Sequence, residues 1–548
     1  MVKKVHKRKR LRAGHQIGGM SAENDFLLSE CFYDNGDYDA IASRNMKKCF
    51  LIGRTGSGKT AILRRLAQQH PTKVIQIDPE SLSLQYISNS PYIRELMEAN
   101  VRLDLFFKAL WKHVFIVEII RHKYKIDSPE AKTTILKWLK DRIIKNPSRL
   151  KALKYFEEFG EQFWCDAHER VRELSNKFET SLRGDLSLPT QAVSAGLGFS
   201  KLKTSEEKRQ FSVKAQQRVN QTQLARLNEM IKILDEEILG NDQDFRYVIV
   251  DDLDKEWVDD DIANTLIRCL FQSVVDFLDV KNLKILVALR TNIFDQLGYS
   301  ERRRGAQEEK HRGLIQFIDW NREDLTGLLE KRIEQFSIYY AYDRMLNFYS
   351  LFPQKTQRHG DPLEVLLDHT LMRPRDIISL VNHCIRLSAG KSSISWQHID
   401  EALDAYSLER LMALRDEWKD PYFDIGKFYN HFQAKDVEFE YEGLKRRVLE
   451  DVILLLADVR FRGRFWLETL TESFWKPDAS AQDEEDTYLE LIRLLFRVGF
   501  LGIAAPNSDE FRYSYDEKYL PRTESLGPGW KFRVHPAFQR ALNLMGRT

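Results

Sequence analysis

Residues 53–60 read Gly-Arg-Thr-Gly-Ser-Gly-Lys-Thr, and this stretch decides the fold. An apolar run at residues 48–52 precedes it and suits a buried parallel strand, and a helical pattern starts at Ala61. The spacing GxxxxGK(S/T) between a strand and a helix is that of a P-loop. The glycines of a P-loop let backbone N–H groups curl around phosphates, and the following helix adds positive potential there. An incidental glycine turn is the alternative interpretation.

The side chains of this loop have distinct expected roles. Lys59 would reach the β- and γ-phosphates of a nucleotide, and the Thr60 hydroxyl would hold Mg²⁺. The expected cofactors are therefore ATP and Mg²⁺. The residues expected to contact the nucleotide are Gly53, Arg54, Thr55, Gly56, Ser57, Gly58, Lys59, Thr60 and Ala61.

The second half of such a site is expected where another apolar strand ends in acidic residues. The run at 245–250 leads into Asp251, Asp252 and Asp254. Asp251 is placed to hold Mg²⁺ through water or Thr60, whereas Asp252 can point towards the γ-phosphate and orient the attacking water. Asp254 is better suited to a helix N-cap. An incidental acidic turn is the alternative for the whole run.

The rest of the chain predicts an α/β fold with a parallel-sheet P-loop NTPase core. Apolar runs at 73–78, 283–289 and 313–318 read as further strands, and helical stretches alternate with them. A large helical insertion is expected at about 95–242, with a loop or hairpin at 184–203. The predicted domains are a basic tail at 1–24, the core at 25–320, a helical lid at 321–418 and a winged-helix-like C-terminal domain at 419–548.

The P-loop, the acidic strand end and the following strand together resemble the additional-strand P-loop ATPases. Within that class the chain is similar to the bacterial KAP and STAND-like groups, whose relatives include origin-recognition AAA+ proteins. The resemblance rests on residues 53–61 and 248–254. Typical KAP proteins carry membrane helices between these motifs, whereas this chain has a soluble helical insertion there. A membrane-linked function is therefore not carried over.

The resemblance implies a sensor residue at the end of the fourth strand, in contact with the γ-phosphate or its water. Arg290 or Asn292 occupies that place, with a polar strand-end turn as the alternative. It also implies an arginine finger before the fifth strand, commonly supplied by a neighbouring subunit. The candidates are Arg302, Arg303, Arg304 and Arg312, and a solvated basic loop is the alternative.

A second sensor is implied in the helical lid, where an arginine at a helix start reaches the nucleotide. The segment 371–377 contains Arg373 and Arg375 around Pro374, a residue suited to a first helical turn. We favour Arg375 over Arg373. The alternative is that both residues form only surface ion pairs.

The C-terminal region predicts helices followed by a two- or three-stranded wing, an order that resembles a winged helix. Apolar helical stretches at 444–459 and 488–498 precede candidate strands at 499–503, 511–515 and 530–534. A DNA-reading helix before the wing should carry basic residues for phosphates. Acids outnumber bases there instead, which favours contact with protein over DNA (Asp483, Glu484, Glu485, Asp486 and Glu490 against Arg493 and Arg497).

Charge is distributed unevenly along the 548 residues, which carry 84 Lys and Arg against 82 Asp and Glu. Seven of the first twelve residues are basic, and removing them leaves 77 bases against 82 acids, about −5. Only the tail therefore suits a polyanionic partner. A disordered, solubilising tail or a start-site artefact is the simpler interpretation. An arm that binds nucleic acid or an acidic partner is the next, and nuclear localisation is the third.

Several function classes are excluded by pattern. No apolar run is long enough for a membrane span, and the basic N-terminus lacks the apolar region of a secretory signal. The five cysteines are far apart with no CxxC, which fits a reducing cytoplasm better than a zinc cluster or a disulfide scaffold. No catalytic set of a nuclease, protease or deaminase stands out.

The leading hypothesis is an oligomeric ATPase that couples its nucleotide state to a protein partner. By resemblance, such ATPases often serve as sensors or motors in bacterial antiviral defence. The alternative is a DNA-binding initiator or loader of the origin-recognition kind, supported by the basic tail and the winged helix. A nucleotide-gated scaffold that hardly hydrolyses ATP is the third hypothesis, and Asp252 argues against it because a pure binder needs no second strand-end acid.

Overall fold

The structure is a computed structural model in which contacts divide the chain into two compact units. The parallel-sheet unit comprises residues 36–54 and 59–318, and the helical unit comprises residues 1–35, 55–58 and 319–548. The residues that the structure describes are 10–79, 82, 91–126, 129–145, 147, 150, 153–154, 180, 212–213, 216, 224–253, 260–297, 312–419, 421–455, 466, 470–472, 476, 478, 480–516 and 526–544.

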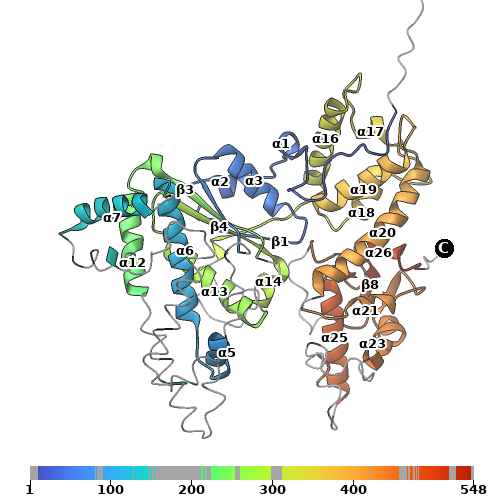
Figure 1. Cartoon of the computed structure of the whole chain (residues 1–548). Coiled ribbons are helices and arrows are strands. Elements are labelled where there is room, and N and C mark those ends of the chain that lie inside the picture. Colours follow the sequence, from blue (N-terminus) through green and yellow to red (C-terminus); the bar gives the residue numbers. More distant parts are fainter. Residues whose placement is uncertain are drawn as a thin grey trace, which may run out of the picture. The chain divides into compact units, whose positions relative to one another are not determined.

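The parallel-sheet unit is built on five strands in the order β2-β3-β4-β1-β5, and all four neighbouring pairs are parallel (Figure 1). This confirms the predicted parallel sheet. The fourth strand in the chain lies between the first and the third, so the carboxyl ends of these three strands are neighbours at one edge. The strands are β1 (Phe50–Gly53), β2 (Val74–Ile77), β3 (Arg246–Val250), β4 (Leu283–Arg290) and β5 (Ile315–Phe317).

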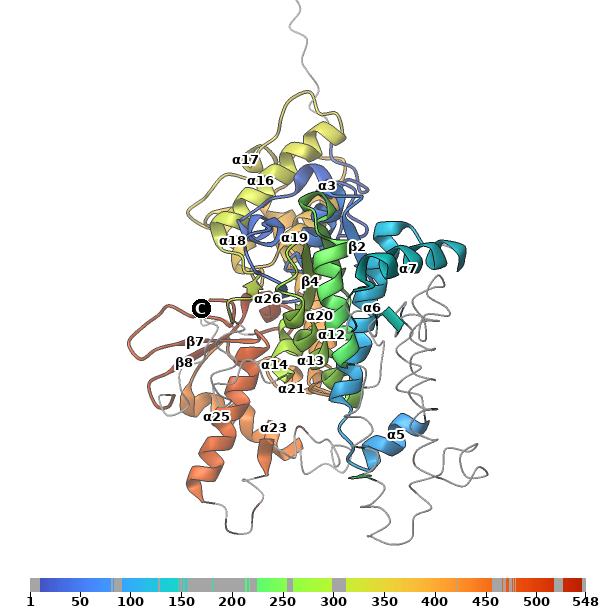
Figure 2. The ribbon, with the colours of Figure 1, turned by 90° about the vertical axis from the view of Figure 1, so that its left-hand side faces the viewer.

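Helices cover both faces of this sheet, because alternate strand residues point to opposite sides and both sets are buried. Phe50 and Ile52 belong to a core with α6 (Asp104–Tyr124), α12 (Leu224–Ile233) and α13 (Asp260–Asp276). On the other side Tyr247 donates its hydroxyl hydrogen to the carbonyl of Ala42, the last residue of α2. The helices α2 (Asp37–Ala42) and α3 (Lys59–Gln69) pack together there. Figure 2 shows α6 and α12 of the opposite side running next to each other.

The helical insertion is confirmed where the structure describes it, between β2 and β3. Its elements are α5 (Pro91–Glu98), α6, α7 (Pro129–Ile143), α12, the π-helical turn Leu234–Ile238 and the 3₁₀ turn Asp242–Asp244. Thirteen residues of α6 are buried, so this helix is surrounded by core on most sides. The predicted loop or hairpin at 184–203 lies outside the described residues. Within the described residues, no helix combines the length and apolarity that crossing a membrane requires.

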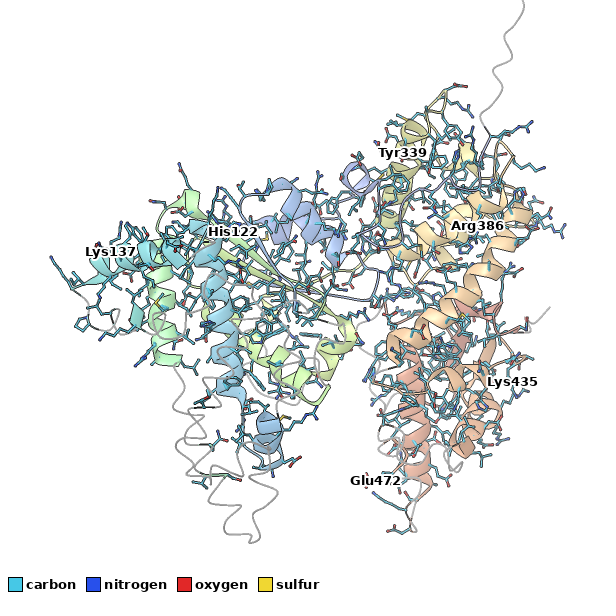
Figure 3. All side chains as sticks on the ribbon, in the orientation of Figure 1. His122, Lys137, Tyr339, Arg386, Lys435 and Glu472 are labelled. Atoms are coloured by element: carbon cyan, nitrogen blue, oxygen red, sulfur yellow. The ribbon has the colours of Figure 1, made fainter. Side chains whose placement is uncertain are left out.

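In the helical unit, α19 and the longer α20 pack against each other. Proline at the first position starts α19, and a capping box at Ser395 starts α20. Figure 3 labels Tyr339 near the end of α16 and Arg386 near the end of α19 in this unit. The helices before the C-terminal region are α1 (Leu28–Cys31), α16 (Arg322–Tyr339), α17 (Phe348–Leu351), α18 (Pro362–Asp368), α19 (Pro374–Leu387) and α20 (Trp396–Trp418).

Residues 10–27, which we call the N-terminal strap, belong to the core of the helical unit. Leu11 and Ile17 are buried, with exposed fractions of 1% and 0%. The backbone N–H of Ile17 donates to the side-chain oxygen of Asn382 (2.9 Å) on α19. Asp25 forms an ion pair with Arg332 of α16 (2.7 Å), and both side chains are almost fully buried. Much of the strap lies in the segment predicted as a basic tail, and the predicted domain boundaries stay predictions.

The C-terminal region has the helix-then-wing order that the sequence predicted. Its three strands form an antiparallel sheet in the order β6-β8-β7, and α25 directly precedes β7. Residues 511–515 form a single bridge at Arg512 instead of a strand, because Asp516 accepts from the Tyr513 N–H and closes a turn there. The elements are α21 (Gly426–Asn430), β6 (Glu438–Glu440), α22 (Tyr441–Leu444), the π-helical turn Lys445–Leu449, α23 (Glu450–Leu455), α25 (Ala481–Arg497), β7 (Leu501–Ala504), β8 (Lys531–Val534) and α26 (Pro536–Gln539).

Candidate nucleotide-binding site

The P-loop connects β1 to α3, as the sequence predicted, and Lys59 is the first residue of the helix. The Lys59 Nζ donates to the backbone carbonyls of Gly53 (2.8 Å) and Arg54 (3.1 Å). The lysine side chain therefore folds back across the loop that carries it. An ammonium group held by two neutral carbonyls can exchange them for phosphate oxygens, which bind it more strongly because they are charged.

Two glycines of the loop adopt a backbone conformation that other residues rarely adopt. The φ angles are +78° at Gly56 and +102° at Gly58. A Cβ atom at Gly56 would lie 2.8 Å from the Cβ of Arg375, whereas one at Gly58 would meet nothing closer than Trp320 at 4.0 Å. Gly56 is therefore required by both space and conformation, and Gly58 by conformation alone.

Within the parallel-sheet unit, Thr60 and Asp251 join the start of α3 to the end of β3. The Thr60 hydroxyl donates to Asp251 Oδ2 (2.9 Å). The backbone N–H of Asp252 donates to the other carboxylate oxygen of Asp251 (2.9 Å). Burial raises the pKa of Asp251, and the two hydrogen bonds hold the rise back. The sequence predicted that these two side chains would act together, and they are in direct contact.

Asp252 has a left-handed backbone, with a φ of +60°. A residue with a Cβ atom pays about 1 to 2 kcal/mol for this conformation. Such strain persists only where the surrounding structure imposes it, and it is concentrated at functional sites. The side chain is half-buried. The strained position thus coincides with the residue to which the sequence assigned the orientation of the attacking water.

The predicted sensor residues Arg290 and Asn292 lie at the end of β4. Arg290 is the last strand residue, and it is the register partner of Gly53 in the pairing of β1 with β4. Asn292 is buried in the first turn of α14 (Thr291–Gln296). The topology thus brings both residues to the strand edge at which the P-loop begins.

The arginine-finger candidates are placed less fully. Arg312 is exposed, just before β5. The candidates Arg302, Arg303 and Arg304 lie outside the described residues, as does Asp254. Their roles stay predictions.

The tip of the P-loop, residues 55–58, belongs to the helical unit. Trp320 donates its indole N–H to the carbonyl of Ser57 (2.8 Å). The backbone N–H of Arg375 donates to the carbonyl of Gly56 (3.4 Å), and the Nε of Arg375 donates to the carbonyl of Met20 in the strap (2.9 Å). Arg375, the favoured second-sensor candidate, therefore contacts the loop through its backbone.

Arg373 lies in a buried charge network at the start of α19. Its guanidinium donates to the carbonyl of Thr55 (3.0 Å) and forms ion pairs with Asp376 (2.9 Å) and Glu417 (3.0 Å). Arg410 also pairs with Asp376 (2.9 Å). Burial alone would raise the pKa of Asp376. Arg373 and Arg410 outweigh this effect and lower that pKa to about 2. The alternative of surface ion pairs does not describe Arg373, because its exposed fraction is 4%.

Sequence reasoning missed three contributors to the loop tip, namely Glu417, Trp320 and Met20. Glu417 accepts the backbone N–H of Thr55 (3.3 Å). None of the three lies in a motif, and each is far from the loop in sequence. No pattern in the chain could have identified them, because their positions follow from the packing of the strap and α20.

The donor set at the end of β3 and the start of α3 fits Mg²⁺. The Thr60 hydroxyl and the Asp251 carboxylate are hard oxygen ligands, and Mg²⁺ is usually held by one or two such groups together with phosphates and water. Within the described part of the chain, no cluster of three or more His, Cys, Asp or Glu side chains could hold a metal ion by itself. The hydroxyl oxygens of Thr55 and Ser57 are buried without a hydrogen-bond partner, as far as the described residues show. These orphaned hydroxyls suit a phosphate ligand.

A comparison with known protein families matches one part of the chain. The model of a family described as the FunZ-associated C-terminal helical domain matches residues 323–415, which run from α16 into α20. No curated protein matches the chain.

Two solved structures align over most of the chain, with low TM-scores. A Walker-type ATPase of Pyrococcus abyssi is 12% identical, with 94% of this chain and 96% of that chain covered and a TM-score of 0.34. The ORC1 protein of Aeropyrum pernix, solved in complex with DNA, is 11% identical, with 94% of each chain covered and a TM-score of 0.31. Scores this low do not establish a shared fold over the whole chain.

Proposed function

We propose that the chain is a Mg²⁺-dependent ATPase of the P-loop class. The observation that carries this proposal is the hydrogen bond between the Thr60 hydroxyl and Asp251 (2.9 Å). It joins the residue after the P-loop lysine to the acid at the end of a neighbouring strand. A glycine turn and an acidic turn that arose independently would have no reason to meet.

The chain's own residues supply binding, orientation and charge. Lys59 exchanges its two carbonyl partners for phosphate oxygens, and its charge offsets the charge that develops on the transferred phosphoryl group. Thr60 and Asp251 would hold Mg²⁺, which would supply positive charge against the charge of the phosphates. Asp252 accepts a proton from the attacking water or orients it. Arg290, in register with Gly53, contributes positive charge at the same edge of the sheet.

The test is ATP binding and phosphate release by the whole chain with and without Mg²⁺. Lys59→Ala should lower turnover by a factor on the order of 10² or more, because it removes a charge aimed at the transferred phosphate. Lys47→Ala is the matched control, since Lys47 is an exposed lysine of the same unit whose only described ion pair is with Asp279 (3.9 Å). Turnover that survives Lys59→Ala, or that is absent from the parent with Mg²⁺ present, would contradict the proposal.

The finer assignment is to the KAP- and STAND-like groups, with the ATPase acting as an oligomer that couples its nucleotide state to a protein partner. The observation in favour is the position of β4 between β1 and β3, the arrangement expected of additional-strand ATPases. In this assignment Arg304 or Arg312 acts as a finger towards a neighbouring copy, and the biological setting is antiviral defence. Light scattering with and without MgATP tests whether the chain forms an oligomer. A finger supplied by a neighbouring copy also requires that turnover per molecule rise with protein concentration.

A DNA-binding initiator is the second candidate function, and the helix-then-wing order of α25, β7 and β8 favours it. The charges of the wing favour it less. Lys531 pairs with Asp509 (2.6 Å), and Arg533 pairs with Glu438 (2.6 Å). Cations already paired with carboxylates must lose those partners before they bind phosphates, so a protein partner is the preferred proposal.

A further inference from the structure

Thr55, in the tip of the P-loop, is held through both of its backbone groups by the side chains of Glu417 and Arg373 in the helical unit. Its N–H donates to Glu417 Oε1 (3.3 Å), and its carbonyl accepts from Arg373 Nη1 (3.0 Å). The same nitrogen of Arg373 donates to the other oxygen of Glu417 (3.0 Å). The two side chains and the Thr55 backbone thus form a closed ring of hydrogen bonds, which we call the Thr55 clamp.

The side chains of the Thr55 clamp are largely shielded from solvent, and further hydrogen bonds hold Arg373 in place. Arg373 has an exposed fraction of 4%, and the side chain of Glu417 has one of 10%. Asp376 fixes the guanidinium of Arg373 through two hydrogen bonds (2.9 and 3.3 Å) and also accepts from the backbone N–H of Leu371 (3.0 Å). Arg410 holds the second oxygen of Asp376 (2.9 Å). Arg373 and Asp376 come from the start of α19, and Arg410 and Glu417 come from the last three turns of α20.

The direction of the carbonyls determines where the backbone donors of the loop point. The carbonyls of Thr55, Gly56 and Ser57 accept from Arg373, Arg375 and Trp320 in turn. In a trans peptide the carbonyl of one residue and the N–H of the next point in opposite directions. The N–H groups of Gly56, Ser57 and Gly58 are therefore directed away from these partners. Successive N–H groups that point to one side form an anion-binding nest.

We propose that Glu417 and Arg373 are positioning residues that hold this nest in its phosphate-binding conformation through the backbone of Thr55. The proposal rests on the proposed nucleotide-binding function, and it adds that the end of α20 sets the geometry of the loop. Neither side chain needs to touch the nucleotide. The chemical class of ligand is a nucleoside triphosphate, bound as its magnesium complex.

Charge and positioning predict opposite effects for the loss of Glu417. A carboxylate beside a loop that binds a polyanion opposes binding, so removal of its charge alone should raise the affinity for nucleotide. If Glu417 acts by holding the loop, its removal frees Thr55 and Arg373 and lowers the affinity. The sign of the change therefore separates the two roles.

The experiment measures MgATP affinity, KM and kcat for the full chain carrying Glu417→Gln, Glu417→Asp or Arg373→Lys. Glutamine removes the charge, aspartate is one methylene too short to span Thr55 and Arg373, and lysine lacks the fork that reaches Thr55, Asp376 and Glu417 together. We expect each variant to bind MgATP about tenfold more weakly, the usual effect of losing a hydrogen bond to a charged group. KM should rise by the same factor, with kcat much less affected.

Asp416→Asn is the matched control, because Asp416 is the neighbouring acid on the same helix. Its ion pair with Arg415 is exposed, with both side chains more than half accessible to solvent. This control should bind like the parent. A purely structural role would lower the thermal midpoint and the active fraction without changing the KM of the molecules that remain folded. If Glu417→Gln fails to fold, Glu417→Asp decides the question, since it keeps the buried charge.

Unchanged or tighter MgATP binding by the folded Glu417 variants would overturn the Thr55 clamp as a positioning device. Failure of the proposed function is a different result, in which the parent itself binds no MgATP and Lys59→Ala is indistinguishable from it.

Discussion

Gly53 and Arg290 are register partners in the parallel pairing of β1 with β4, so the P-loop and the segment after β4 leave the sheet at the same level. The neighbouring strand β3 leaves earlier, because its last residue, Val250, pairs with Val287, three residues before Arg290. The two acids after β3 therefore begin lower on the sheet than the arginine at the end of β4.

Replacement of Asp251 or Asp252 by asparagine should affect different properties of the protein. Asp251→Asn should weaken Mg²⁺-dependent ATP binding, because a metal ligand that also accepts from Thr60 loses its charge. Asp252→Asn should keep the affinity and slow turnover by about 10² to 10⁴, the usual contribution of a general base. The measurements are nucleotide affinity with and without Mg²⁺ and single-turnover hydrolysis. An equal loss of affinity in both variants would remove the distinction.

Mg²⁺-dependent nucleotide binding should weaken as the pH falls. The loss should begin at a higher pH than it would if the metal ligand were an aspartate of ordinary pKa. Burial raises the pKa of Asp251 above the usual 3.8, so this carboxylate takes up its proton earlier as the pH falls. Protons and Mg²⁺ compete for the same oxygens, so affinity is lost as the pH falls through the raised pKa. A titration of Mg²⁺-dependent ATP affinity against pH checks this. Asp251→Asn should lack the transition, and a midpoint near 3.8 in the parent would contradict the assignment.

The same shift affects stability with the opposite sign. A carboxyl whose pKa is raised by folding favours the folded state when it is protonated, so its contribution is present at low pH and is lost as the pH rises. The nucleotide-free chain therefore bears a cost at neutral pH that bound Mg²⁺ removes. Addition of MgATP at neutral pH should therefore raise the thermal unfolding midpoint more in the parent than in Asp251→Asn. Thermal unfolding of both proteins with and without MgATP gives the comparison.

Loss of Asp25 should destabilise the helical unit strongly. Asp25→Ala leaves the buried guanidinium of Arg332 without its carboxylate and removes the acceptor of the Gly19 N–H, which should cost about 3 to 5 kcal/mol. Glu364→Ala is the control, since its pair with Arg322 is half exposed and should contribute less than about 1 kcal/mol. Denaturant unfolding of both variants gives the comparison. Similar effects of the two changes would show that the strap is not part of the core.

Deletion of residues 1–9 tests the nucleic-acid alternative. The cut is placed before Leu11 because that side chain is buried and its backbone exchanges hydrogen bonds with Gly390 and Lys391. We expect duplex DNA to bind weakly and without sequence preference, with a salt slope of roughly −0.9 per neutralised phosphate, and the deletion to abolish binding. ATP turnover should persist. Tight, sequence-selective binding by the truncated chain would promote the initiator over the protein-coupled ATPase.

The sequence predicted the parallel sheet and the Thr60–Asp251 pair because both follow from local patterns. Apolar runs with short spacings define strands, and parallel strands bring their carboxyl ends to one edge. It named Arg375, and Arg373 beside it, as candidates to reach the nucleotide, while the structure adds Glu417 and Trp320 at the loop tip. These residues are hundreds of positions from the loop, so only the packing of helices could bring them there.

The N-terminal strap was missed for a related physical reason. Its seven basic neighbours dominate the composition, and the two apolar side chains that bury it, Leu11 and Ile17, form no periodic pattern. Gly18 adopts a φ of +148° beside Asp25 and the guanidinium of Arg332, a fit that depends on the finished helical unit. A pattern-based prediction cannot detect a segment whose order comes entirely from its partners.

The strap also sets the order in which parts of the chain can fold during synthesis. Ile17 binds Asn382, which lies 365 residues later in the chain. At typical rates of about 5 to 20 residues per second, a ribosome needs roughly 20 to 70 s to make that length. Every residue of the parallel-sheet unit has been made before Asn382 exists, so this unit can fold while Leu11 and Ile17 still have no site to occupy. A growing chain must therefore keep these two apolar side chains from other contacts over this interval.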